Sequence, residues 1–277
     1  MFKSKRYDDE TLKHLQQVQK MMLKDFIKIC EENDITYFVN GGTLLGTIRH
    51  RGFIPWDDDI DLMMFRKDFE KLNKIMSEKP NDKYHLFNVL NEETYPYTFA
   101  RFNLKNTLLE EFWANQVDYE PNIFMDIFIL DNLPKNNIKR FFYKWRCFLL
   151  TQISLHRSIK YENESKLKQF VQQCAYYILK ILPISQISLK KRCVKTYKKY
   201  ENYDSDEVCD FPALIMLPIY KRNDWLPPKK AKFEDIEVNV PNNPDAILKI
   251  IYGDYMKLPP EDKRFRPAPE KIDFGEY

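Results

Sequence analysis

The sequence has no run of about 18 apolar residues, so no membrane-spanning helix is expected. Its opening residues, MFKSKRYDDE, are charged and do not resemble a signal peptide. The five cysteines are odd in number and include no CxxC pair, which is typical of reduced thiols in the cytoplasm. No Ser–His–Asp or Cys–His arrangement can be recognised, and His14, His85 and His156 have no companion at metal-ligand spacing. The sequence therefore gives no indication of nucleophilic catalysis by serine or cysteine.

The composition is that of a folded protein. Of the 277 residues, 44% are hydrophobic, 31% are charged and 15% are aromatic, which argues against disorder. This length suits one large domain or a domain with an insertion. The net charge of +3 hides an asymmetry, because residues 135–200 carry 16 Lys or Arg and two acids, for +14, and the rest of the chain carries −11. A strongly basic segment is thus joined to an acidic body.

The order of hydrophobic patterns predicts an α+β fold. Apolar residues at three- and four-residue spacing predict helices, and short β-branched and aromatic runs predict strands. The expected helices cover 9–32, 43–49, 67–78 and 245–252, with a helical segment from 137 to about 200. The expected strands cover 36–39, 59–65, 84–89, 97–104, 123–130 and 234–240. We therefore expect a core of helices and strands at 1–134, a basic helical insertion at 135–205, and a C-terminal part at 206–277 that completes the domain of the core.

Four aspartates occupy five positions, Asp57, Asp58, Asp59 and Asp61, directly before an apolar strand. Such a density of like charge repels itself and is expensive to bury without a partner. Alternation along a strand would place Asp57, Asp59 and Asp61 on one side and Asp58 on the other, as a solvated or paired surface acid. Carboxylates that converge in this way form a hard-oxygen site suited to Mg²⁺ or Mn²⁺.

A glycine turn precedes these acids. Gly41, Gly42 and Thr43 lie between an expected strand and an expected helix. The turn is either a tight connection alone or a cradle for phosphate, since glycines allow close approach and helix N-termini favour anions. The neighbouring acids favour the cradle, because phosphoryl transfer needs a phosphate site beside a divalent metal.

Two further positions have alternative interpretations. Asp126 is isolated in the apolar run FMDIF, so its carboxylate is either satisfied by local hydrogen bonds or is a ligand. The acidic strand nearby favours the ligand. Arg49, with His50 and Arg51, forms either a solvated loop paired with the acids or a contact to phosphate.

The residues resemble a known family. The longest match is GGTLLGTIRHRGFIPWDDDIDL, which resembles the signature of LicD-family phosphotransferases, shared with fukutin and fukutin-related protein. The similarity continues in three further segments, ARFNLKNT, FMDIFILDNLP and FEDIEVNVPNNPDAILKIIYGDYMKLPP. It covers most of the chain outside the basic insertion, and its first motif is too long and specific for a chance match.

The resemblance implies a nucleotidyltransferase fold, a small mixed sheet flanked by helices. It places the catalytic metal carboxylates on Asp59, Asp61 and Asp126. Asp57 precedes the strand and is expected to support them from outside the ligand set, and the oxygen ligands indicate Mg²⁺ or Mn²⁺. Fukutin-related protein carries a zinc-binding cysteine cluster; none is visible here, so no structural zinc is expected. Arg101 and Lys105 lie in a matching segment and either bind phosphate or are exposed strand charges. The expected donor-binding residues are Gly41, Gly42, Thr43, Arg49, Arg101 and Lys105.

The implied reaction transfers a phospho-alcohol from a CDP-alcohol to a glycan hydroxyl, releasing CMP. LicD proteins are associated with phosphocholine and fukutin-type relatives with CDP-ribitol, so choline, ethanolamine, glycerol and ribitol all stay open. The expected acceptor is a lipid-linked precursor of a cell-surface glycan. Asp126 is the first candidate for the general base. Trp56 and Tyr97 either line a choline pocket or belong to the core.

Two other functions compete with this one. A true nucleotidyltransferase would use the same acids and glycines but move NMP onto the acceptor. A nucleic-acid binder would use the basic segment, but its aromatics follow helical core spacing, so no nucleic-acid partner is expected. Residues 135–200 are instead expected to dock on an anionic membrane without crossing it, at the inner face of the plasma membrane. The alternative is that their two apolar stripes pack on each other as a helical hairpin.

Overall fold

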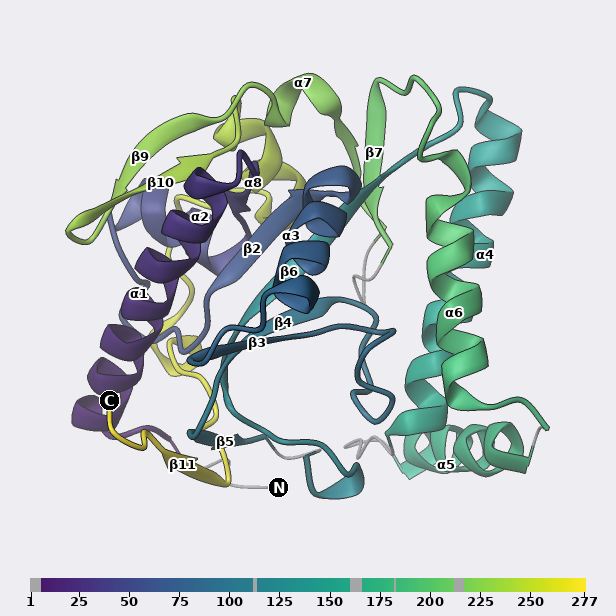
Figure 1. Ribbon diagram of the computed structural model, residues 1–277, viewed down its shortest axis with the longest axis horizontal. Coiled ribbons are helices and arrows are strands. Elements are labelled where there is room, and N and C mark those ends of the chain that lie inside the picture. Colours follow the sequence, from purple (N-terminus) through teal and green to yellow (C-terminus); the bar gives the residue numbers. More distant parts are fainter. Residues whose placement is uncertain (1–5, 112–113, 160–165, 182, 212–216) are drawn as a thin grey trace.

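The computed structural model describes residues 6–111, 114–159, 166–181, 183–211 and 217–277. Its centre is a mixed sheet, which confirms the predicted fold class (Figure 1). The strand order is β1 (Phe38–Val39), β2 (Asp61–Phe65), β6 (Ile123–Asn132), β4 (Ala100–Leu104) and β3 (Tyr84–Phe87). The far end of β6 also pairs with β7 (Glu207–Asp210), which pairs with β8 (Ile219–Lys221). Only the β2–β6 pair is parallel among these ladders of the described chain.

Helices cover the sheet. Figure 1 shows α1 (Asp9–Glu32) and α3 (Arg66–Glu78) lying over one face of it. The N-terminus of α1 is capped by Asp8, whose side chain accepts a hydrogen bond from the Thr11 amide, and its apolar side carries Phe26 against Phe102. The second helix, α2 (Gly41–Arg49), packs against α8 (Pro244–Tyr252).

The C-terminal third of the chain returns to the core. Besides β7 and β8, it supplies the short helix α7 (Arg222–Trp225) and a hairpin of β9 (Lys229–Phe233) with β10 (Ile236–Val240). The last strand, β11 (Lys271–Asp273), pairs with β5 (Leu108–Glu110). Single 3₁₀ turns cover Ala114–Gln116, Lys198–Tyr200 and Glu261–Lys263.

Three helices form a separate layer beside β7, on the side of the molecule opposite α1 (Figure 1). They are α4 (Asn137–Ser158), α5 (Lys166–Ile181) and α6 (Gln186–Tyr197). The inner face of α4 packs with α6 and β7 through a small core that includes Tyr143, Cys147 and Cys193. One base of this layer, Lys190, is fully buried and donates hydrogen bonds to the backbone carbonyls of Glu92, Glu93 and Tyr95.

The predicted bounds agree best with the structure where the apolar pattern repeats over a long stretch of sequence. The helix predicted over 9–32 has those bounds, whereas the carboxylate strand predicted from Asp59 begins at Asp61. No helix in the described ranges has the length and apolar character needed to cross a bilayer.

Candidate metal centre and active site

The parallel pairing of β2 with β6 brings two acids together. Asp61 is the register partner of Asp126, and the Asp126 amide donates to the Ile60 carbonyl at 2.9 Å. Register partners on neighbouring strands point to the same face of a sheet. Burial, and then the charge of Asp126, raise the pKa of Asp61 to about 7. The segments that the sequence placed on separate strands thus form one acidic site.

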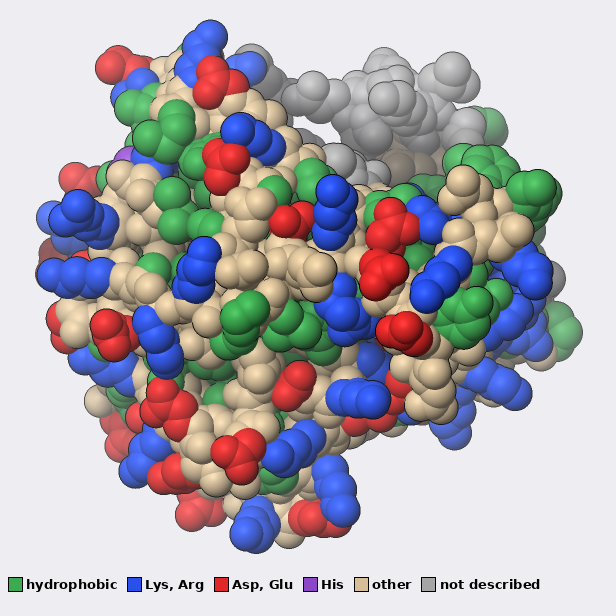
Figure 2. Space-filling model, turned by 90° about the horizontal axis from the view of Figure 1, so that it is seen from above, with side chains coloured by type: hydrophobic (Ala, Val, Ile, Leu, Met, Phe, Trp, Pro, Cys, Tyr) green, Lys and Arg blue, Asp and Glu red, His purple; other side chains and the backbone are tan. Residues whose placement is uncertain are grey.

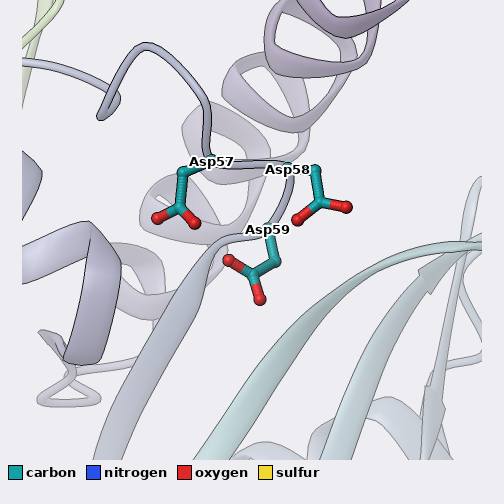
Figure 3. Close-up of side chains that lie close together, drawn as sticks. All are labelled: Asp57, Asp58 and Asp59. Atoms are coloured by element: carbon teal, nitrogen blue, oxygen red, sulfur yellow. The ribbon is translucent and has the colours of Figure 1, made fainter. Parts of the chain in front are cut away.

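Asp57, Asp58 and Asp59 lie in the loop that leads into β2, as Figure 3 shows. One carboxylate oxygen from each lies within 4.8 Å of the other two, so this buried acidic cluster could hold a metal ion. The prediction that Asp58 faces away by strand alternation is wrong, because the three residues precede the strand. The Asp58 carboxylate instead accepts a hydrogen bond from the Tyr7 hydroxyl at 2.9 Å.

The Asp59 side chain carries the clearest mark of a missing partner. Its Oδ1 atom is buried and accepts no hydrogen bond from the described residues. Burial, followed by the charges of Asp61, Asp57 and Asp58, holds the pKa of the Asp59 carboxyl well above its usual range. An unpartnered oxygen among like charges is what a bound cation would satisfy, so the residues present fit a divalent metal.

The glycine turn presses the start of α2 against these acids. Gly41 has a φ of +52°, and a Cβ on it would lie 2.3 Å from Asp61 Oδ2. A Cβ on Gly42 would lie 2.4 Å from Asp57 Oδ2. The Gly42 amide donates to Asp61 Oδ2 at 3.4 Å, and the Thr43 hydroxyl accepts from the Asp61 amide at 2.8 Å. Both positions therefore require glycine, and the helix N-terminus faces negative charge that its dipole favours.

Arg101 is the counter-ion of Asp126. It is 2% exposed, and its Nε donates to Asp126 Oδ1 at 2.8 Å. Its guanidinium also pairs with Glu111 and lies 3.5 Å from the centre of the Phe124 ring. The Arg101 side chain is thus held in place by several contacts. Its single positive charge compensates Asp126 but does not neutralise the other acids of the site.

Two of the expected donor-binding residues do not contact the acids. Arg49 lies at the opposite end of α2 from Gly41 and donates to the Tyr255 carbonyl at 2.7 Å. Lys105 donates to the Asn81 carbonyl at 2.7 Å and lines a separate cavity of about 370 Å³. Neither residue is brought to the carboxylates.

Sequence reasoning missed two partners of the acidic loop. Arg266, from the C-terminal segment, donates through Nε to Asp57 Oδ1 at 2.9 Å and lies 4.0 Å from Asp58 Oδ1. Tyr7 precedes α1. Each is a single residue far from the acids in the chain, and no periodic pattern marks either one.

A mixed sheet whose parallel strands present paired carboxylates beside a glycine turn is the architecture of a nucleotidyltransferase-type domain. Comparison with known proteins agrees, since residues 34–149 match the LicD/FKTN/FKRP nucleotidyltransferase domain. Residues 34–149 therefore form a LicD/FKTN/FKRP-type nucleotidyltransferase domain.

Individual relatives extend this match. The chain is 29% identical over 264 residues to the lipopolysaccharide cholinephosphotransferase LicD of Haemophilus influenzae, covering 91% of this chain and 94% of that relative. It is also 30% identical over 122 residues to an uncharacterised protein of Rickettsia prowazekii, covering 44% of this chain and 41% of that relative. A third match, to an uncharacterised protein of Caenorhabditis elegans, is 66% identical over 32 residues, which cover 12% of this chain and 8% of that protein.

Proposed function

We propose that this protein transfers a phospho-alcohol from a CDP-alcohol to a hydroxyl of a cell-surface glycan precursor, releasing CMP. The observation that carries the proposal is the gathering of acids beside the Gly41–Gly42 turn. Asp61 is the register partner of Asp126, and the loop before it brings Asp57, Asp58 and Asp59 together in a cluster that could hold a metal ion. The similarity to a lipopolysaccharide cholinephosphotransferase over nearly its whole length makes phosphocholine the first candidate for the transferred group.

We propose Asp59, Asp61 and Asp126 as the residues that hold a Mg²⁺ or Mn²⁺ ion, whose all-oxygen ligands suit these metals. Asp57 and Asp58 belong to the same acidic cluster, and one oxygen of each is paired, with Arg266 and Tyr7 respectively. Asp57 would support the site through its ion pair. When bound, such an ion supplies positive charge to the donor pyrophosphate and to the departing nucleotide.

The chain's own residues have three tasks in this proposal. The Gly41–Gly42 turn lets the start of α2 lie against the acids, since a Cβ at either position would meet Asp61 or Asp57. The free amides of this helix N-terminus are suited to bind the donor phosphates. Arg266 is half-exposed and reaches the same loop from the opposite segment, so it is placed to contact the phosphates as well. Burial raises the pKa of Asp126 to about 6, which leaves its carboxylate ionised at neutral pH yet more basic than an exposed acid.

The proposed bond changes are simple. The acceptor hydroxyl gives its proton to Asp126 while its oxygen forms a bond to the phosphorus that carries the alcohol. The bond between that phosphorus and the CMP oxygen breaks. The extension of the sheet by β7 supports assigning residues 206–277 to the catalytic domain, on either side of the helical insertion at 135–205.

The test is a panel of CDP-choline, CDP-ethanolamine, CDP-glycerol and CDP-ribitol, each incubated with Mg²⁺ and a lipid-linked glycan. We expect CMP release with one donor, dependent on the acceptor, and none from Asp59→Asn. Mass spectrometry of the glycan must then show the added phospho-alcohol. A nucleotide attached to the acceptor would instead identify a true nucleotidyltransferase and overturn the proposal.

A further inference from the structure

Helix α4 is apolar on two opposite faces. Its inner face buries Tyr143, Cys147 and Leu155. The opposite face presents five large apolar side chains that are 50–69% exposed: Ile138, Phe141, Phe142, Trp145 and Leu149. Their three- and four-residue spacing places them in one stripe along the helix. In the catalytic body, by contrast, α1 turns its apolar side to the sheet.

The neighbouring helix does not cover this stripe. Among the described residues of α5, four large side chains are also more than half exposed: Phe170, Tyr177, Ile178 and Ile181. The two predicted stripes therefore do not bury one another, as a closed hairpin would require. Exposed apolar side chains concentrated in one layer mark an interaction surface rather than ordinary surface scatter.

The three helices of this layer carry charge of one sign. Helices α4, α5 and α6 contain no Asp or Glu. Lys139 and Arg146, seven residues apart, lie along one border of the stripe and are exposed, with no acidic partner within the described chain. Figure 2 shows blue and green side chains interspersed on the side where these helices stand. Lys190 does not contribute, since it is buried against backbone carbonyls.

We infer that the outer stripe of α4 docks on the surface of an anionic lipid bilayer, with the helix lying in the interface. Aromatic and aliphatic side chains flanked by Lys and Arg are the pattern of helices that bind in this plane. Anionic headgroups also supply the negative charge that the three acid-free helices lack. The inference does not depend on the proposed reaction.

Flotation of the full-length protein with vesicles tests it. Vesicles of phosphatidylcholine with phosphatidylglycerol should carry the protein upward at low salt, and phosphatidylcholine alone should not. Lys139→Glu with Arg146→Glu should lower the bound fraction by at least about tenfold, since each base near an anionic surface contributes on the order of 1 kcal/mol. Phe142→Ser with Trp145→Ser should do the same, because both side chains are exposed and removable without opening the core.

Matched controls carry equal changes on the catalytic body. Lys13→Glu with Lys232→Glu reverses two exposed charges on α1 and β9, and Leu90→Ser removes an exposed apolar side chain from a loop. These variants should float like the wild type. All variants should keep the wild-type melting temperature, which separates loss of binding from loss of folding.

A spectroscopic signal reports the contact directly. Trp145 is half-exposed, so its emission should shift to the blue when anionic vesicles are added, and Trp145→Phe should lose most of that shift while still floating. Equal recovery with neutral and anionic vesicles would overturn the inference, as would unchanged flotation of the stripe variants. A concentration-dependent dimer that Phe142→Ser with Trp145→Ser abolishes would assign the surface to a second copy of the chain instead.

Discussion

Replacing Asp61 by Asn should stabilise the protein when no metal is bound. The substitution keeps the volume of the side chain and an oxygen that can accept from the Gly42 amide, but it removes one of several buried like charges. The negative charges of Asp126 and Asp57 disfavour ionisation of this carboxyl group and raise its pKa. The stability of the metal-free protein therefore measures how strongly the site lacks a cation.

The size of the effect follows from the pKa of Asp61. Burial and its acidic neighbours raise that pKa from 3.8 to about 7. Each pH unit between the unfolded and folded pKa values corresponds to about 1.4 kcal/mol, so ionisation of this group opposes folding by roughly 4 kcal/mol above pH 7. When a neighbouring acid takes up a proton, part of the repulsion is relieved, so the net destabilisation by Asp61 is smaller than this figure. We therefore expect Asp61→Asn to gain about 2 kcal/mol, which is a rise of roughly 4–8 °C in Tm.

The assay is thermal unfolding in EDTA across pH. Between pH 3.8 and about 7 the folded carboxyl holds a proton that the unfolded one has lost, so the wild type loses stability as the pH rises through this window. The advantage of Asp61→Asn should be full above pH 7 and should vanish near pH 4. Added Mg²⁺ should raise the Tm of the wild type and leave Asp61→Asn nearly unchanged.

A matched substitution should have the opposite sign. Asp131 is buried, and both of its oxygens accept hydrogen bonds from Arg66, at 2.8 and 2.6 Å. Asp131→Asn would leave that guanidinium buried without its counter-charge and should cost about 3–5 kcal/mol. If Asp61→Asn lowered the Tm in EDTA at pH 8 as Asp131→Asn does, the electrostatic reasoning about the site would be refuted.

Asp59→Asn should abolish turnover without lowering the Tm, whereas Asp58→Asn should keep most activity, because the Tyr7 hydroxyl can donate equally well to an amide oxygen. Comparing the kcat of these two variants checks the ligand set, and equal losses would place Asp58 within it. Activity should vanish in EDTA and return with Mg²⁺ or Mn²⁺ but poorly with Zn²⁺, as a metal titration of CMP release would show. Trp56→Leu should raise the KM for CDP-choline more than that for CDP-glycerol, since an aromatic face attracts a quaternary ammonium. The Trp56 ring already has the Arg264 guanidinium 5.8 Å from its centre, and an equal change in both KM values would reject this role.

The sequence predicts elements best where a signal is repeated along the chain. The helix over 9–32 combines a long apolar period with an Asp8 cap, and both act locally, so its bounds are those predicted. The strand predicted over 59–65 begins two residues later, at Asp61. The acids before it have an extended backbone in a loop, which the sequence pattern does not distinguish from a strand. That difference changes the position of Asp58, since side-chain alternation ends where the ladder ends.

Contacts across long stretches of chain could not be predicted from the pattern alone. The register of Asp61 with Asp126 is set by a parallel pairing between strands about sixty residues apart. The isolation of Asp126 in an apolar run, together with the family resemblance, indicates the second acid but not the register. Arg266 and Glu111 reach the site as single charged residues in irregular segments. A lone Arg or Glu in such a segment carries no signal that separates a buried ion pair from solvated charge.

The acids of this site differ in how well positive charge or hydrogen-bond donors compensate them. This difference indicates which carboxylates a ligand would contact. Asp126 has a buried guanidinium fixed by Glu111 and an aromatic ring, so its partner cannot leave without opening the core. Asp57 has Arg266, which is half-exposed and free to exchange one anion for another. Asp59 has a buried oxygen with no partner among the described residues, although it lies among the most charged neighbours. Folding thus balances the charge at the sheet and leaves it unbalanced at the loop. In the proposed function, a cation and the donor phosphate would together complete this electrostatic balance.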